Sequence, residues 1–86
     1  MTYVIKWRPK TLDDLRALPK ENTKQLVKRI DLAKENPFHF LEKLVDDPGY
    51  KIRAGDYRVI VDLDPKNKII FVRFIGHRKN IYKQHL

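Results

Sequence analysis

The chain has 86 residues, of which 19 are lysine or arginine and 11 are aspartate or glutamate, so its formal net charge is +8. This length predicts a single domain over residues 1–86 with a small hydrophobic core. The absence of cysteine excludes disulfides, thiol catalysis and cysteine-based metal sites. No apolar run reaches the ~20 residues that a membrane span needs, and the N-terminus lacks a signal-peptide pattern. These features predict a soluble, cytoplasmic protein with a polyanionic partner.

The N-terminal half predicts a short strand followed by a helical hairpin. Alternating apolar residues indicate a strand over residues 3–7. Thr11 is suited to cap a first helix, and Pro19 separates this helix from a second one that stops at Pro37. The apolar stripe of the first helix is Leu12, Leu15 and Leu18. The stripe of the second helix is Leu26, Val27, Ile30 and Ala33.

The C-terminal half predicts three strands, at residues 50–54, 57–64 and 68–75. Gly55-Asp56 joins the first two as a two-residue hairpin loop of the kind that needs glycine at its first position. The order β-α-α-β-β-β therefore predicts an α+β fold, an antiparallel sheet with a helical hairpin on one face. The connection before these strands is expected to lay four apolar side chains on the core, those of Phe38, Phe40, Leu41 and Leu44.

The Gly55-Asp56 loop also predicts which side chains share a face of the sheet. It places Arg53 opposite Arg58 and Lys51 opposite Ile60, and residues directly opposite each other lie on the same side. A loop of two or four residues in the next hairpin keeps the same alternation of side chains between the two faces. The basic side then also includes Arg73, Phe71 and Ile75. Ile70, Val72 and Phe74 join the apolar side. Like charges opposite each other cost up to ~1 kcal/mol, so we interpret the basic side as an anion site rather than only a solvated face.

Other cations and the histidines give weaker signals. A row on the second helix is spaced i, i+4, i+8 and could follow a nucleic-acid backbone or be a solvated face: Lys20, Lys24 and Lys28. His77 borders the basic side, a structural role suits His39 better, and His85 would need an ordered C-terminus. No two histidines have metal-ligand spacing and no carboxylates cluster. The sequence therefore predicts neither a metal nor another cofactor.

Two motifs resemble the RelE family of type II toxins in the RelE/ParE superfamily. They are KIRAGDYRVI at residues 51–60 and VRFIGHRKNIY at residues 72–82. The size and element order are also similar. The resemblance implies a microbial-ribonuclease-like fold and a ribosome-dependent endoribonuclease that cleaves mRNA in the ribosomal A site. It further implies a cognate RelB-like antitoxin, expected to be acidic and partly disordered when free, that wraps the toxin and silences it.

The resemblance also implies roles for individual residues. The catalytic positions of the family fall on Lys51, Arg53, Arg58, Arg78 and Tyr82. The position of Arg53 is often lysine in the family, and an arginine cannot be deprotonated, which leaves Lys51 or Tyr82 as the general base. Tyr82 could instead stack on a base or simply pack. Additional RNA or ribosome contacts are predicted at Arg73, His77 and Lys79 and at the helix lysines, Lys20, Lys24 and Lys28.

Two other classes of protein stay open. A toxin resembling ParE would act on DNA gyrase and would not need the basic catalytic set. A non-enzymatic RNA-binding module would bind with strong salt dependence and yield no cleavage products.

Overall fold

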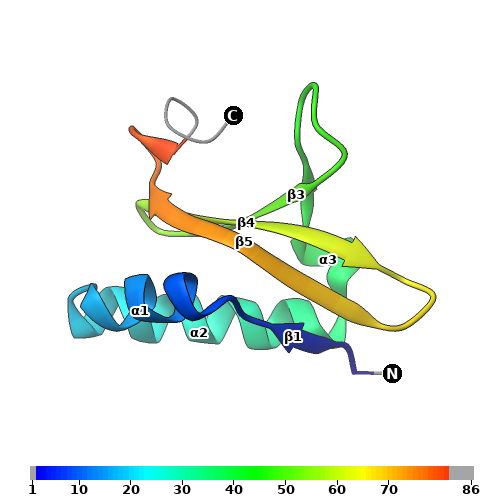
Figure 1. The fold of residues 1–86 in the computed structure, drawn as a ribbon, viewed down its shortest axis with the longest axis horizontal. Coiled ribbons are helices and arrows are strands. Elements are labelled where there is room, and N and C mark those ends of the chain that lie inside the picture. The colour runs from blue at the N-terminus through cyan, green and yellow to red at the C-terminus, as the bar shows by residue number, and fades with distance from the viewer. Residues whose placement is uncertain (1, 82–86) are drawn as a thin grey trace.

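The computed structural model describes residues 2–81, which form a five-stranded sheet with two long helices on one face (Figure 1). The elements follow in the order β1 (Val4–Lys6), α1 (Pro9–Ala17), α2 (Lys20–Glu35), α3 (Pro37–Phe40), β2 (Glu42–Lys43), β3 (Tyr50–Ala54), β4 (Tyr57–Asp64) and β5 (Ile69–His77). Within these described residues, no helix has the length and apolar character needed to cross a membrane.

The sheet has the strand order β1-β5-β4-β3-β2. Its mixed α+β class and the helical hairpin on one face are confirmed. The sheet is not wholly antiparallel, however, because β1 runs parallel to β5. The direction of a short edge strand depends on the path of the whole chain, which alternation of side chains does not encode. The short elements α3 and β2 were also not predicted, and β2 has only two residues, both exposed.

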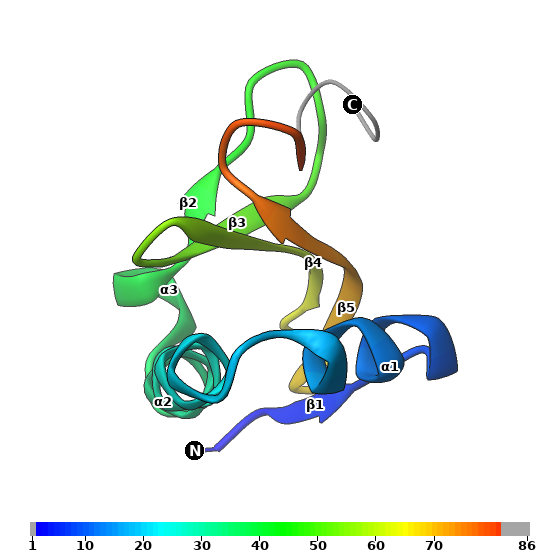
Figure 2. The same cartoon turned by 90° about the vertical axis from the view of Figure 1, so that its left-hand side faces the viewer.

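The main core lies between the helices and the sheet (Figure 2). Leu26, Ile30 and Ala33 of α2 are buried there, at the i, i+4, i+7 spacing of one helix face. Val27 lies off this stripe with 40% of its surface exposed, and Phe38 is 69% exposed, so both were wrongly predicted to join the core. Five of the other residues that were predicted to join the core do pack in it: Leu12, Leu15, Leu18, Phe40 and Leu41. Leu44 is buried instead in a second apolar cluster, with Ile60 and Ile81.

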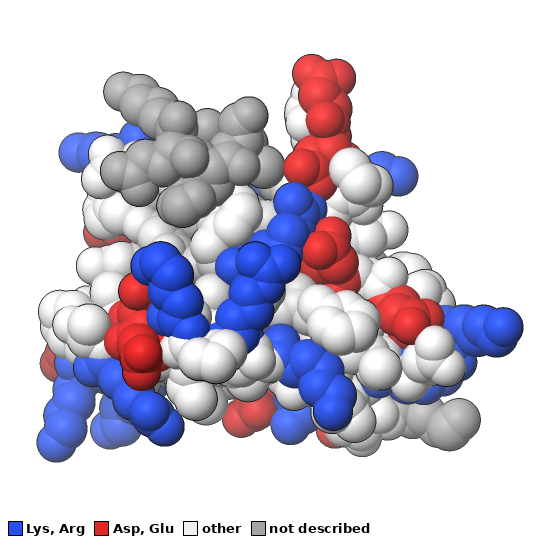
Figure 3. All heavy atoms as spheres, viewed as in Figure 1, with Lys and Arg blue, Asp and Glu red and all other residues white. Residues whose placement is uncertain are grey.

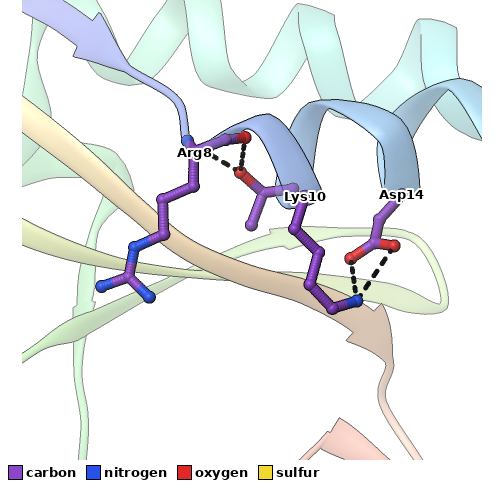
Figure 4. Close-up of polar contacts among 4 residues, drawn as sticks. Arg8, Lys10 and Asp14 are labelled. Carbon is purple, nitrogen blue, oxygen red and sulfur yellow. Dashed lines mark hydrogen bonds and ion pairs between the residues drawn. The ribbon is translucent and has the colours of Figure 1, made fainter.

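The first helix begins earlier than predicted, at Pro9 rather than after Thr11. Proline suits the first helical position because its missing N–H would have no partner there. Thr11 still supports this end of the helix: its Oγ1 accepts a hydrogen bond from the Arg8 N–H at 3.1 Å and donates one to the Arg8 carbonyl at 2.8 Å (Figure 4). Lys10 and Asp14, which lie one turn apart on the same helix, form an exposed ion pair at 3.3 Å (Figure 4).

The β4–β5 ladder contains an irregularity that changes which residues share a face. Val61 pairs with Val72, but the preceding Ile60 pairs with Phe74, so that Arg73 is the extra residue of a β-bulge. After the bulge, the side chains of β5 that would have faced one side of the sheet face the other side. Phe74 therefore lies on the side of Ile60, and Ile75 packs in the main core, the opposite of what the sequence predicted.

Candidate functional site

The sheet face opposite α1 and α2, called here the outer face, carries the candidate site. The predicted β3–β4 register is confirmed: Arg53 pairs with Arg58, and Lys51 pairs with Ile60. Gly55 makes the connecting turn with a φ of 61°, a left-handed conformation that glycine adopts without steric cost. Because Ile52 and its partner Val59 face the main core, Lys51, Arg53 and Arg58 are all directed to the outer face.

Arg53 and Arg58 are held by different neighbours. The Nε atom of Arg53 lies 3.0 Å from Glu42 Oε2, in an exposed ion pair. The Nη1 atom of Arg58 donates to the carbonyls of Gly55 at 2.7 Å and of Tyr57 at 2.8 Å. Among residues 2–81, Arg58 forms no ion pair with a carboxylate. Its charge is therefore positioned by neutral carbonyls and is not cancelled, which suits a guanidinium that binds phosphate.

Replacing Arg53 by alanine should leave the melting temperature unchanged or raise it. The exposed ion pair with Glu42 contributes at most about 1 kcal/mol, while removal of the Arg53–Arg58 pair relieves a repulsion of up to ~1 kcal/mol. Thermal unfolding of the wild type and of Arg53→Ala, measured in the same buffer, tests this prediction. A clear fall in melting temperature would contradict our interpretation that the sheet tolerates this repulsion for the sake of binding.

The segment that follows β5, residues 78–81, is anchored to the same hairpin turn. The Arg78 N–H donates to the Asp56 carbonyl at 2.8 Å, and Arg78 Nε lies 3.6 Å from Asp56 Oδ1. Arg58 and Arg78 thus both make contact with the Gly55-Asp56 turn. Of the five residues predicted to be catalytic, the structure places Lys51, Arg53 and Arg58 on the outer face and Arg78 at the turn between β3 and β4. The fifth, Tyr82, lies outside the described residues.

His77 pairs with Tyr57, the first residue after this turn, and Lys79 follows two residues later. The ring of His77 meets that of Tyr57 edge-on, with centroids 5.5 Å apart. His77 Nδ1 accepts a hydrogen bond from the Lys79 N–H at 3.1 Å, which fixes its ring and leaves Nε2 as the second polar atom. Their predicted contacts with RNA remain predictions. Within residues 2–81, no group of three or more histidine, aspartate or glutamate side chains could hold a metal ion.

The predicted helix lysines are not part of the outer face. Lys20, Lys24 and Lys28 are exposed on α2, which covers the opposite face of the sheet (Figures 1 and 2). Near the outer edge, Arg29 and the exposed His39 line a hollow of about 340 Å³ together with Arg53. The three helix lysines and the cations of the outer face thus lie on opposite sides of the sheet, with Arg29 and Arg53 lining the hollow between them.

Arg73 reaches two carboxylates instead of solvent. Its guanidinium forms two contacts with Asp47, at 2.6 and 3.3 Å, and its Nε lies 3.0 Å from Asp62 Oδ2. Only 19% of the Arg73 side chain is exposed. Figure 3 shows acidic atoms over the loop between β2 and β3, with basic atoms directly beside them. The positive charge of Arg73 is therefore balanced locally, unlike that of Arg58.

The contacts of Asp47 lower the pKa of its carboxyl group. The hydrogen bond from Arg73 is the main cause, and the Gly49 N–H, which donates to Asp47 Oδ1 at 2.7 Å, adds to it. The same bond to Asp47 raises the pKa of Arg73. Both shifts favour the charged pair at neutral pH.

Asp47→Asn should consequently destabilise the protein at pH 7 but not in acid. An aspartate whose folded pKa lies below its unfolded value of about 3.9 contributes stability above that value, and this contribution is lost as the pH falls through the folded pKa. Melting temperatures of both proteins between pH 7 and pH 2 test the prediction. The difference between them should be largest near neutrality and should close below about pH 4. A difference that does not change with pH would contradict it.

A second apolar cluster lies on the outer face and was not predicted. Leu44, Ile60 and Ile81 are buried in it, and Phe74 packs against them. One sequence signal was available, the run Val59-Ile60-Val61, because three consecutive apolar residues indicate a strand covered on both faces. The cluster places buried apolar side chains on the outer face, next to Lys51, Arg58 and Arg78.

Solved structures of toxins share this fold. The toxin–antitoxin complex RelBE2 from Mycobacterium tuberculosis aligns with a TM-score of 0.79 over 91% of this chain and 100% of that one, at 18% identity. The archaeal RelE–RelB complex from Pyrococcus horikoshii aligns with a TM-score of 0.76 over 93% and 99% of the two chains, at 28% identity. The fold is thus that of the RelE-like toxins.

Sequence comparison gives the family. The sequence model described as "ParE toxin of type II toxin-antitoxin system, parDE" matches residues 5–82. A protein of Methanocaldococcus jannaschii described as a candidate toxin, RelE1, is 30% identical over an alignment of 88 positions, which covers 96% of this chain and 98% of that protein. The chain belongs to the RelE/ParE family of toxins from type II toxin–antitoxin systems.

Proposed function

We propose that this toxin is a ribosome-dependent endoribonuclease that cleaves mRNA in the ribosomal A site and so inhibits translation. The observation that carries the proposal is the convergence of Arg58 and Arg78 on one hairpin turn, next to Lys51 and Arg53 on the outer face. A non-nuclease toxin has no evident need for four cations around the β3–β4 hairpin. The proposed target also places the protein in the cytoplasm.

The proposed reaction is attack by an RNA 2′-hydroxyl on its own adjacent phosphate. The 2′-oxygen forms a bond to phosphorus, the bond to the 5′-oxygen breaks, and a 2′,3′-cyclic phosphate and a 5′-hydroxyl result. Lys51 or Tyr82 removes the 2′-hydroxyl proton, because an arginine cannot act as a base at neutral pH. Arg58 and Arg53 stabilise the extra negative charge of the phosphorane. Arg78 stabilises the leaving 5′-oxygen, which takes a proton from water to become the 5′-hydroxyl.

Dependence on the ribosome follows from the chemistry of the candidate base. Neither lysine nor tyrosine is ordinarily a strong base at neutral pH, so a general base of either type is a weak catalyst there. Intrinsic cleavage should therefore be slow, and a ribosome that orients the message would supply much of the rate through positioning.

The experiment is to incubate the toxin with a labelled message, alone and on programmed ribosomes. We expect fragments cut at the A-site codon with ribosomes and very few without.

We propose that a cognate antitoxin is the second partner. Relatives of this fold were crystallised with their antitoxins, including the RelE–RelB complex from P. horikoshii and the RelBE complex from Escherichia coli. A partner for this chain should be acidic, since the net charge of the toxin is +8. It should also be partly disordered when free, because wrapping a small domain favours a segment that folds on binding.

The second candidate function is that of a toxin acting on DNA gyrase, favoured by the match to the ParE family model. The two functions are separable with purified components. Inhibition of gyrase supercoiling without cleavage of ribosome-bound message would favour the gyrase function. Salt-sensitive RNA binding without either effect would indicate a plain RNA-binding module.

A further inference from the structure

The loop between β2 and β3, residues 44–49, is fastened to the sheet by the ion pair between Asp47 and Arg73. Asp47 Oδ1 lies 2.6 Å from Arg73 Nη2 and also accepts the Gly49 N–H at 2.7 Å. The Leu44 N–H in turn donates to the Gly49 carbonyl at 3.1 Å, which closes the loop. A Cβ atom at Gly49 would collide with the Arg73 guanidinium and lie 2.9 Å from the Val61 carbonyl oxygen. The loop is therefore pressed closely onto the sheet at this point.

Leu44 connects this loop to the C-terminal segment. Its side chain belongs to the second apolar cluster together with Ile60 and with Ile81, which is only 1% exposed. Phe74, the residue that follows Arg73 in β5, joins the same cluster. A Cβ atom added to Gly76 would lie 3.3 Å from Ile81 Cβ, so the segment lies close against β5 there. Figures 1 and 2 show loop 44–49 and the end of the described chain on the same side of the sheet.

The same segment carries Arg78 and is held at two points. One is the Asp56 carbonyl, which accepts the Arg78 N–H at 2.8 Å, and the other is Ile81 in the second cluster. Between them, the Asn80 N–H donates to the His77 carbonyl at 2.9 Å and forms a tight turn. Release of Ile81 would leave Arg78 held only at Asp56, through its N–H and the exposed 3.6 Å contact of its guanidinium, and would loosen its position relative to Arg58.

We propose that Asp47 and Arg73 are positioning residues, which hold Leu44 in the apolar cluster that contains Ile81 and thereby fix Arg78 at the turn that Arg58 also contacts. This inference rests on the proposed function. It assigns Arg73 a role inside the protein in place of the predicted contact with RNA, in agreement with its low exposure and its two carboxylate partners. The pair acts through packing and touches neither the phosphate nor the reacting oxygens.

The test compares Asp47→Asn with a matched control, Asp64→Asn. Asp64 is also a hydrogen-bonded aspartate: it accepts from the Asn67 side chain at 2.8 Å and from the Asn67 N–H at 3.2 Å. It lies in the β4–β5 hairpin, at the opposite end of β5 from Arg78 (Figure 1). Asp47→Glu keeps the carboxylate and serves as the conservative variant. Amide hydrogen exchange over residues 77–81 and the kcat and KM of cleavage on programmed ribosomes are measured for all of them.

We expect Asp47→Asn to speed amide exchange of Arg78 and Asn80 by about tenfold or more, and to lower kcat by about 10- to 100-fold with KM changed less than about twofold. Asp64→Asn should change neither, and Asp47→Glu should restore most of both. Equal effects of the two Asn variants, or unchanged exchange in Asp47→Asn, would overturn the proposal. So would faster exchange with an unchanged kcat. If the wild type cleaves nothing, the proposed function fails, and exchange alone decides whether the pair holds the segment.

Discussion

Arg58→Ala should reduce ribosome-dependent cleavage by at least about 10²- to 10³-fold, the usual cost of removing one donor to a transition-state oxyanion. Arg58 is the cation of the outer face that is held by carbonyls and pairs with no carboxylate among residues 2–81. In the proposed mechanism, its removal leaves the developing phosphorane charge without one of its two arginine partners. The fold should persist, because the residues that pack the strand, Val59, Ile60 and Val61, are unchanged.

A surface arginine on the helical side provides the control for that experiment. Arg16 on α1 is 70% exposed and pairs only loosely with Asp13, at 3.9 Å. Arg16→Ala removes the same charge from the protein and should retain cleavage within a few fold. If Arg58→Ala still cuts ribosome-bound message at the wild-type rate, Arg58 has no part in the mechanism. If both variants lose activity equally, the effect reflects net charge and not the outer face.

Leu26→Ala should destabilise the protein by about 2–5 kcal/mol, the range for truncating a fully buried leucine. Leu26 on α2 has no exposed surface and contributes to the main core against the sheet. Small domains have total stabilities of about 5–15 kcal/mol, so this one substitution removes a large fraction. Denaturant unfolding, with the midpoint and slope compared between the proteins, measures the loss.

The neighbouring residue is a matched control on the same helix. Val27 is 40% exposed, and Val27→Ala should cost less than about 1 kcal/mol. This comparison distinguishes the observed stripe, Leu26, Ile30 and Ala33, from the predicted one, which included Val27. Equal costs at the two positions would contradict the way the structure orients α2 on the sheet.

The β3–β4 hairpin could be predicted from the sequence because local chemistry determines it. Gly55 specifies a two-residue turn, the turn sets the register, and the period of two then directs Lys51, Arg53 and Arg58 to one face. No contact between distant residues was needed. In the structure, the three cations of this hairpin do lie on one face of the sheet.

Features that depend on contacts between distant residues could not be predicted. The bulge at Arg73 leaves no local signature, yet it exchanges the faces of Phe74 and Ile75. Asp47, the partner of Arg73, lies 26 residues away in a loop, so Arg73 was assigned to the RNA-binding cations. The parallel direction of β1 similarly depends on where the chain returns after α2.

The central claim is that the outer face cleaves RNA on the ribosome, and the chemistry of the cut ends tests it most directly. Programmed ribosomes carrying a 5′-labelled message are incubated with the wild-type toxin, and the 3′ end of the labelled fragment is identified. We predict a cut at the A-site codon that leaves a 2′,3′-cyclic phosphate, with its formation strongly reduced in Arg58→Ala. An intact message under conditions in which the same preparation inhibits gyrase supercoiling would contradict the claim.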